Sequence, residues 1–539
     1  MSLYYLADKK RRAELNGKSL DDTSAYIPAI LRFLGVSGKE TDIDRLNELK
    51  ETDVLIASGC KLPELLCTVI SFAENINAYD IPEQKVYGYV SCGGKDAAVF
   101  VPFLKPAIEN GVVKAFARTV EGEAVPALVK HGKKYEFTFD LPGSVWRSGD
   151  GFPAPGGKGG FTIGRVPDMR PLPVEEDSSV AYNDELCELV KRILLENGVP
   201  LFHTLPPLSK KNVPDMAVHV SGDDDATSSN MNLTAACNME MFGIPYHVNA
   251  MVVPGDPTSF VMDRDRYEEL KSHGCEVGLH INFNDVPYTL EGQKQHIDLF
   301  EKIFGERAYT NSNHCFYCNG STAERLSWLE ACGVKGDNCK LGEVDPNDAN
   351  VYNVMGFGFG TSFPRYTCTD ASEGNRIVET LEIPINYYEP RLDKDIFNDE
   401  NKIERYIDSG AAYGRVVQFF IHPHYLSPTY AKITSTFNAL NKIKSHIAEK
   451  GYKVWYTTTN NITDYWHKRS ASEITECKNG EFAVNALCPL CLVLPDGAES
   501  AYINGEKTVI HEKTVNGKAL KLISLLEKGK YDIKVEYSL

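Results

Sequence analysis

Strand and helix patterns alternate along residues 183–467 at the spacing of βα units, and this repeat restricts the region to an α/β architecture with a parallel sheet. Apolar residues at helical spacing predict helices at Asn183–Asn197, Asn232–Phe242, Arg264–His273, Lys294–Phe304, Ala323–Cys332, Glu400–Tyr413 and Tyr430–Lys450. Short apolar runs between them predict strands at Ala217–Val220, Tyr246–Val252, Glu276–His280, Thr380–Ile385, Arg415–Ile421 and Lys453–Thr457. These units suffice for one distorted (β/α) barrel.

The regions on either side of this repeat show other patterns. Residues 1–180 mix helix and strand signals before a stretch rich in Pro and Gly, which predicts a separate α/β domain with a parallel sheet. Its expected elements include helices at Ser24–Gly35 and Pro63–Asn75 and a strand at Thr52–Gly59. After Arg469, short alternating runs separated by Asp-Gly and Asn-Gly turns predict a small antiparallel β-sandwich. The predicted domains are therefore 1–180, 181–467 and 468–539.

Composition excludes several classes of function. The net charge of −17 argues against nucleic acid as the partner, and no run of 18 apolar residues marks a membrane span. The 14 cysteines show no disulfide framework, and the first residues lack a secretory signal pattern. We expect a cytoplasmic protein, or an exported one if a signal peptide has been removed. A homo-oligomer is compatible with the sequence.

Three predicted strands of the middle region carry acids or imidazoles at their ends. The run Ala217–Asp225 ends in three consecutive carboxylates, which repel one another unless a cation or a shared proton relieves them. His280 lies in the apolar run that begins at Glu276, and the run from Val416 ends in His422 and His424. Strand ends meet at the mouth of a barrel, so this pattern predicts a metal site there.

These motifs resemble those of the polysaccharide deacetylase family, also called carbohydrate esterase family 4 or the NodB-homology domain. In that family a strand ends in Thr-Phe-Asp-Asp-Gly, and Ser221–Asp225 occupies the same place. The resemblance implies that Asp223 is the general base, Asp224 and His280 bind the metal, and His422 protonates the leaving group. Asp225 is expected to cap the next helix. The N-terminal region weakly resembles a class I glutamine amidotransferase or flavodoxin-like fold, and no active-site residue follows from that likeness.

The second metal-binding histidine of the family is replaced here by Asn284. An amide oxygen is a poorer ligand than imidazole for a borderline metal such as zinc. Three alternatives remain open. Asn284 ligates weakly or orients a water, His314 from the next βα loop supplies the missing imidazole, or the metal has been lost. His424, two residues after His422, is a further candidate for ligation or substrate contact, although an intervening proline leaves its direction open.

The expected activity is that of a metal-dependent hydrolase that removes acetyl groups, by amide or ester cleavage, from an amino sugar, a glycan or an N-acetylated small molecule. The expected cofactor is a divalent metal, with zinc first and cobalt, nickel or manganese as alternatives. A metal on Asp224, His280 and His314 would activate water and polarise the carbonyl. Two other functions fit the same motifs: a carbohydrate-binding barrel that has lost catalysis, and a metal-free amidohydrolase.

Overall fold

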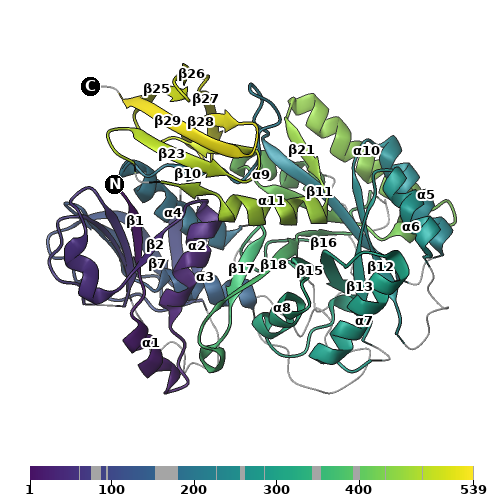
Figure 1. The fold of residues 1–539 in the computed structure, drawn as a ribbon, viewed down its shortest axis with the longest axis horizontal. Coiled ribbons are helices and arrows are strands. Elements are labelled where there is room, and N and C mark those ends of the chain that lie inside the picture. Colours follow the sequence, from purple (N-terminus) through teal and green to yellow (C-terminus); the bar gives the residue numbers. More distant parts are fainter. Residues whose placement is uncertain are drawn as a thin grey trace.

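Figure 1 shows the architecture of the chain in a computed structural model, which describes residues 1–59, 61–73, 86–92, 95–151, 180–225, 228–254, 262–283, 286–342, 354–392, 401–430, 433–475 and 477–537. The N-terminal region (purple) lies beside the middle region (teal and green), and the C-terminal strands (yellow) lie above their junction. Helix α11 (Thr459–Ala471) runs beneath the C-terminal strands. Among the described residues, no helix combines the length and the apolar character needed to cross a bilayer.

The middle region is built on a curled sheet whose central strands are parallel. Its order is β16 (Val354–Met355), β19 (Tyr387–Tyr388), β20 (Val416–Phe420), β11 (Met216–Asp223), β12 (Tyr246–Val252), β13 (Glu276–Ile281), β14 (Thr310–Asn313), β15 (Gly336–Leu341), β18 (Ile377–Ile385) and β17 (Arg365–Cys368), with β21 (Val454–Thr457) beside β11. Among the described residues, no ladder joins β16 to β17, so the sheet is an open half-barrel rather than a closed barrel. Parallel pairing from β19 to β18 brings the carboxyl ends of these strands to one rim.

Helices cover the outer face of this sheet. They are α5 (Ser229–Met241), α6 (Arg264–Ser272), α7 (Leu290–Phe304), α8 (Thr322–Ala331), α9 (Lys402–Tyr413) and α10 (Ile433–Lys450). Helix α4 (Tyr182–Glu196) instead packs against β5 (Gly88–Cys92) and β6 (Lys95–Val99) of the N-terminal region. Helix α7 shows why such segments start and stop where they do, because the Thr289 side chain accepts a hydrogen bond from Gly292 N and Gly305 ends the helix in the left-handed conformation. Buried residues such as Val248, Leu270 and Phe300 fill the space between sheet and helices.

The N-terminal region contains one mixed sheet rather than the parallel sheet expected. Its order is β2 (Lys39–Thr41), β1 (Leu3–Leu6), β3 (Val54–Ser58), β4 (Thr68–Phe72), β9 (Lys134–Phe137), β8 (Ala124–His131), β7 (Val112–Thr119), β5 (Gly88–Cys92) and β6 (Lys95–Val99). Pairing is parallel from β2 to β9 and antiparallel from β9 to β6.

One expected helix of this region is wrong. The segment Pro63–Asn75 contains strand β4, because the β-branched run Thr68-Val-Ile pairs with β3 in the buried centre of the sheet. The helix expected at Ser24–Gly35 is confirmed as α2 (Ile27–Leu34), which ends at Gly35 with a φ of 75°.

The C-terminal strands form two antiparallel sheets. One has the order β22 (Glu473–Ile474), β23 (Glu481–Ala486), β29 (Gly529–Tyr537), β25 (Ala498–Ile503) and β26 (Glu506–Lys507). The other has the order β10 (Leu201–Phe202), β24 (Leu490–Val493), β28 (Lys518–Leu525) and β27 (His511–Val515). Strand β10 precedes the middle sheet in the chain and pairs with β24. This β-ladder therefore joins the C-terminal strands to the middle region.

Arg469 of α11 ties all three regions together. Its guanidinium donates hydrogen bonds to the carbonyls of Arg32 and Phe33 in the N-terminal region and of Phe202 and His203 at β10. Burial lowers the pKa of Arg469 to about 10, so the side chain stays charged at neutral pH.

Candidate metal centre

Chemically active side chains from four parallel strands meet at the carboxyl rim of the half-barrel. Asp223 ends β11 and Asp225 follows it, while His280 lies in β13. His314 follows β14 and opens the short helix η4 (His314–Phe316), and His422 follows β20. The parallel register explains why residues far apart in sequence are neighbours here.

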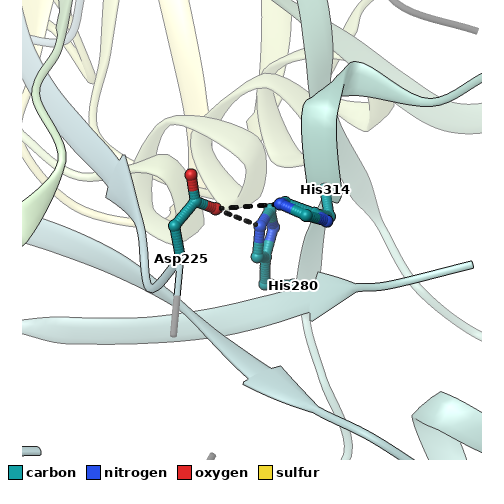
Figure 2. A group of neighbouring side chains, drawn as sticks. All are labelled: Asp225, His280 and His314. Carbon is teal, nitrogen blue, oxygen red and sulfur yellow. Dashed lines mark hydrogen bonds and ion pairs between the residues drawn. The ribbon is translucent and has the colours of Figure 1, made fainter. Parts of the chain in front are cut away.

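Asp225, His280 and His314 form a group that could hold a metal ion (Figure 2). One ligand atom from each residue lies within 4.8 Å of the others. The same Asp225 oxygen, Oδ1, lies 3.1 Å from His280 Nε2 and 3.6 Å from His314 Nε2. Two imidazoles and one carboxylate are a donor set typical of catalytic zinc sites, which leave a coordination position for water.

His280 is oriented for ligation by contacts on its other ring nitrogen. Nδ1 lies 2.9 Å from the carbonyl oxygen of Ser312 and 3.4 Å from Asp223 Oδ2, so the proton sits on Nδ1 and Nε2 faces Asp225. Burial alone would lower the pKa of His280, but Asp223 and Asp225 raise it above its usual value. Without a cation the group is held together as an ion pair.

A strained turn presents His314 to the group. The two residues after it, Cys315 and Phe316, have φ values of 57° and 53°, a left-handed conformation that costs non-glycine residues energy. Phe316 turns inward and packs against Phe420 at a ring separation of 5.6 Å. Because Phe420 packs at 5.1 Å against His422, the turn connects His314 to the aromatic residues that pack against His422.

The three acids of the run differ in their contacts with His280. Asp223 is the last residue of β11, and both Asp223 and Asp225 contact His280. The group takes its carboxylate from Asp225, whereas the sequence favoured Asp224 as ligand and Asp225 as a cap. Asp224 is buried, and its backbone N–H donates to the carbonyl of Asn249.

Asp223 sits behind His280. Its two oxygens accept hydrogen bonds from Asn249 Nδ2 at 2.8 Å and Ser312 Oγ at 3.0 Å. Burial raises the pKa of Asp223, and the nearby His280 and His422 oppose that shift. These contacts suit a residue that holds a ligand in place.

His422 faces the same carboxylate from the opposite side. Its Nε2 lies 3.2 Å from Asp225 Oδ2, and its Nδ1 lies 2.5 Å from Glu389 Oε1, which also accepts the His422 backbone N–H. Burial would lower the pKa of His422, but Asp225 and Glu389 hold that pKa well above its usual range. The ring is therefore a positioned proton carrier beside the candidate metal group.

The sequence did not identify Glu389 as a candidate site residue. It lies just after β19 at 1% exposure, and burial raises its pKa against the opposing effect of His422. Its φ of 48° is a backbone strain that only the structure reveals. The sequence signal was weak, because a single Glu before Pro390 indicates no chemistry by itself.

His424 is not part of the metal group. The His424 ring packs at 3.7 Å against Tyr425, and burial next to His422 lowers the pKa of His424 to about 4. That ring borders His422 at a centroid distance of 5.6 Å. Asn284 lies outside the described residues.

Comparison with known proteins finds similarity to solved structures at low sequence identity. The sequence matches no protein-family model, and a search of curated proteins finds no match. Among solved structures, a Mycobacterium smegmatis protein assigned as a polysaccharide deacetylase is 12% identical, with 51% of this chain and 99% of that chain covered and a TM-score of 0.33.

Two further solved structures each cover about half of this chain at low sequence identity. A family 4 carbohydrate esterase from Bacillus anthracis is 11% identical, covering 48% of this chain and 86% of that one at a TM-score of 0.25. A peptidoglycan deacetylase from Bacillus subtilis is 13% identical, covering 48% and 94% at a TM-score of 0.25. TM-scores this low say nothing about activity, so the function is inferred from the site itself.

Proposed function

We propose that this chain is a hydrolase that uses a divalent metal to remove acetyl groups from an N-acetylated amino sugar or glycan. The single observation that carries the proposal is the grouping of Asp225, His280 and His314 beside the His422–Glu389 pair at one rim. The groups needed for amide hydrolysis, which are ligands for a Lewis acid and a positioned acid–base, thus lie around one point.

The proposed ligands are Asp225, His280 and His314. Nitrogen and carboxylate donors favour zinc, and cobalt, nickel and manganese suit the same set. A bound divalent ion would polarise the acyl oxygen and lower the pKa of a water molecule toward about 7. Asp225 replaces Asp224 in this assignment because it contacts His280.

His422 is the proposed proton carrier. A cation bound to Asp225 would oppose the effect of that carboxylate on the pKa of His422, which would leave the ring neutral and able to accept a proton. As water adds to the acyl carbon, its proton passes to Nε2 of His422, and the same nitrogen then gives a proton to the amine as the carbon–nitrogen bond breaks. Glu389 holds Nδ1 and stabilises the imidazolium between the two steps. Asp223, expected from the sequence as the base, is assigned to positioning because both its oxygens face neighbours behind His280.

Acetate release tests the proposal. Zinc-loaded protein is incubated with N,N′,N″-triacetylchitotriose and with 4-nitrophenyl acetate, and acetate is measured for the unmodified protein and for Asp225→Asn. We expect release that a chelator abolishes and that Asp225→Asn lacks. Release that persists after the chelator would favour a metal-free amidohydrolase. Binding of the trisaccharide without release would favour a carbohydrate-binding barrel that has lost catalysis.

A further inference from the structure

A chain of buried polar side chains leads away from the metal group into the half-barrel. Asn249 of β12 donates from Nδ2 to Asp223 Oδ1, so its Oδ1 points the other way, toward His247 Nε2 at 3.0 Å. His247, Asn249 and Asp223 are 0%, 0% and 2% exposed. Polar groups this deeply buried are tolerated when each has a defined partner, and their hydrogen bonds are strong because water is absent.

The hydrogen bonds determine which atoms carry protons along this row of side chains, starting from the Asp223 carboxylate. A carboxylate accepts, so the Asn249 amide must donate to Asp223 and accept from His247, which therefore carries a proton on Nε2. On its far side His247 Nδ1 lies 3.7 Å from Glu276 Oε2, an ion-pair distance longer than a hydrogen bond. Thr310 Oγ1 lies 3.5 Å from Nε2 and donates instead to Asn460 at 2.6 Å. The direct partner of His247 on the metal side is thus Asn249.

Gly278 provides the space that the His247–Asn249 hydrogen bond occupies. A Cβ at that position in β13 would lie 2.5 Å from Asn249 Oδ1 and 2.6 Å from His247 Nε2, inside the hydrogen bond that joins them. Backbone conformation does not demand glycine there, because Gly278 is not among the residues with positive φ. The absence of a side chain at Gly278 is therefore explained by the buried chain that it accommodates.

We propose that His247 is a positioning residue for the metal centre: acting through Asn249 and Asp223, it holds His280 with Nδ1 protonated and Nε2 directed at the ion. The inference rests on the proposed function only in that an ion is bound at Asp225, His280 and His314. Partners behind a metal-binding histidine raise its basicity and fix its tautomer, and their loss weakens metal binding by about 10–100-fold.

The test compares two buried histidines, of which His247 bonds to Asn249 and His219 does not. His219 of β11 is also 0% exposed, but its Nε2 bonds to Thr459 Oγ1, away from Asn249 and Asp223. His247→Leu and His219→Leu therefore remove comparable buried imidazoles. His247→Gln keeps an N–H near the position of Nε2 and serves as the conservative variant.

Zinc affinity is measured by competition with a chelator, together with the melting temperature and the visible spectrum of the cobalt-loaded protein. We expect His247→Leu to weaken zinc binding by about 10–100-fold and to alter the cobalt spectrum. His247→Gln should remain close to the unmodified protein, and His219→Leu should lower the melting temperature while leaving zinc affinity unchanged. Equal loss of affinity in both leucine variants, or no loss in either, would overturn the proposal.

A second readout keeps the inference independent of metal binding. In metal-free protein carrying ¹⁵N-histidine, the Nδ1 proton of His280 should give a signal protected from exchange with water, identified by its absence in His280→Gln. We expect the signal to persist in His219→Leu and His247→Gln and to be lost in His247→Leu. If the unmodified protein binds no zinc, the proposed function fails, and this signal still decides the role of His247. Its persistence in folded His247→Leu would refute that role.

Discussion

Two charge clusters of the middle sheet differ in what balances their carboxylates. At the rim, the partners of Asp225 among the described residues are the imidazoles of His280, His314 and His422. Deeper in the sheet, Arg325 of α8 lies between Asp337 of β15 and Glu382 of β18. Its Nη2 lies 2.9 Å from Asp337 Oδ2 and also contacts Glu382 Oε2.

The difference separates the proposed metal group from a cluster that contains its own cation. A guanidinium is always charged and fills the space between the two acids that it pairs with. Burial would lower the pKa of Arg325, yet Asp337 and Glu382 raise it well above its usual value. Imidazoles, in contrast, can lose their protons and accept a metal ion in place of them. Asp225 is thus balanced by protons or by a cation, whereas the deeper cluster contains its own permanent cation.

The largest expected effect concerns the proton carrier. His422→Gln keeps the contour of the rim and removes the titratable ring, so kcat for acetate release should fall by about 10²–10⁴-fold. Zinc content and melting temperature should stay close to those of the unmodified protein, because His422 is outside the ligand group. Loss of zinc in this variant would show that His422 is a metal ligand and would contradict its proposed role as proton carrier.

A smaller effect, on stability, is expected from Arg325→Met. The substitution leaves Asp337 and Glu382 buried without their cation, which should lower the free energy of unfolding by about 3–5 kcal/mol in denaturant titrations. Added zinc should not restore the lost free energy of unfolding. Arg376→Met is the control, because Arg376 and Glu330 form an exposed pair, with side chains 46% and 25% accessible, worth about 0–1 kcal/mol. Equal losses in both variants would contradict the structural role of Arg325.

The pH dependence of the metal-free protein should show the smallest effect. His422 has a pKa raised by Asp225 and Glu389, so its stabilising contribution is present below about 6.5 and is lost as the pH rises through the folded value. The pKa of Asp225 is held far below its usual range, mainly by His422 and His280 against burial, so its contribution is lost only in strong acid.

Chelator-treated protein should therefore unfold at lower denaturant concentration at pH 8 than at pH 6. The groups facing His422 are Asp225, Glu389 and the rings of Tyr388, Phe420, His424 and Tyr425. His422→Gln should flatten this dependence. Zinc should reverse it, since ligand imidazoles must be deprotonated to bind. A metal-free protein that gains stability between pH 6 and pH 8 would exclude the ion-pair description of the rim.

The sequence predicted most of the elements that position the site. The expected helices and strands of the middle region correspond to α4–α10, β11–β13, β18, β20 and β21. Strands β14 and β15 were missed because their sequences, Thr-Asn-Ser-Asn and Gly-Asp-Asn-Cys-Lys-Leu, are polar and yet fully buried. Hydrogen bonds within the sheet interior, such as that from Asn311 to Asp337, satisfy these side chains, and hydrophobic periodicity cannot detect such a core.

The structure brings the predicted histidines together, and their roles as ligands and proton carrier stay predictions. His280, His314 and His422 carry distinct signals, being single imidazoles at strand ends or in the following loop, and the structure brings them around one acid. Choosing among Asp223, Asp224 and Asp225 depends on which of them contact His280, and the order of three adjacent acids does not determine this. Glu389 became recognisable only from its contact with His422.

Metal content of two adjacent variants tests the central claim most directly. Asp225→Asn and Asp224→Asn are prepared beside the unmodified protein, loaded with zinc, and measured by elemental analysis. We expect one zinc per chain in the unmodified protein, close to one in Asp224→Asn and little or none in Asp225→Asn. Zinc retained by Asp225→Asn and lost from Asp224→Asn would contradict the ligand group that Asp225, His280 and His314 form.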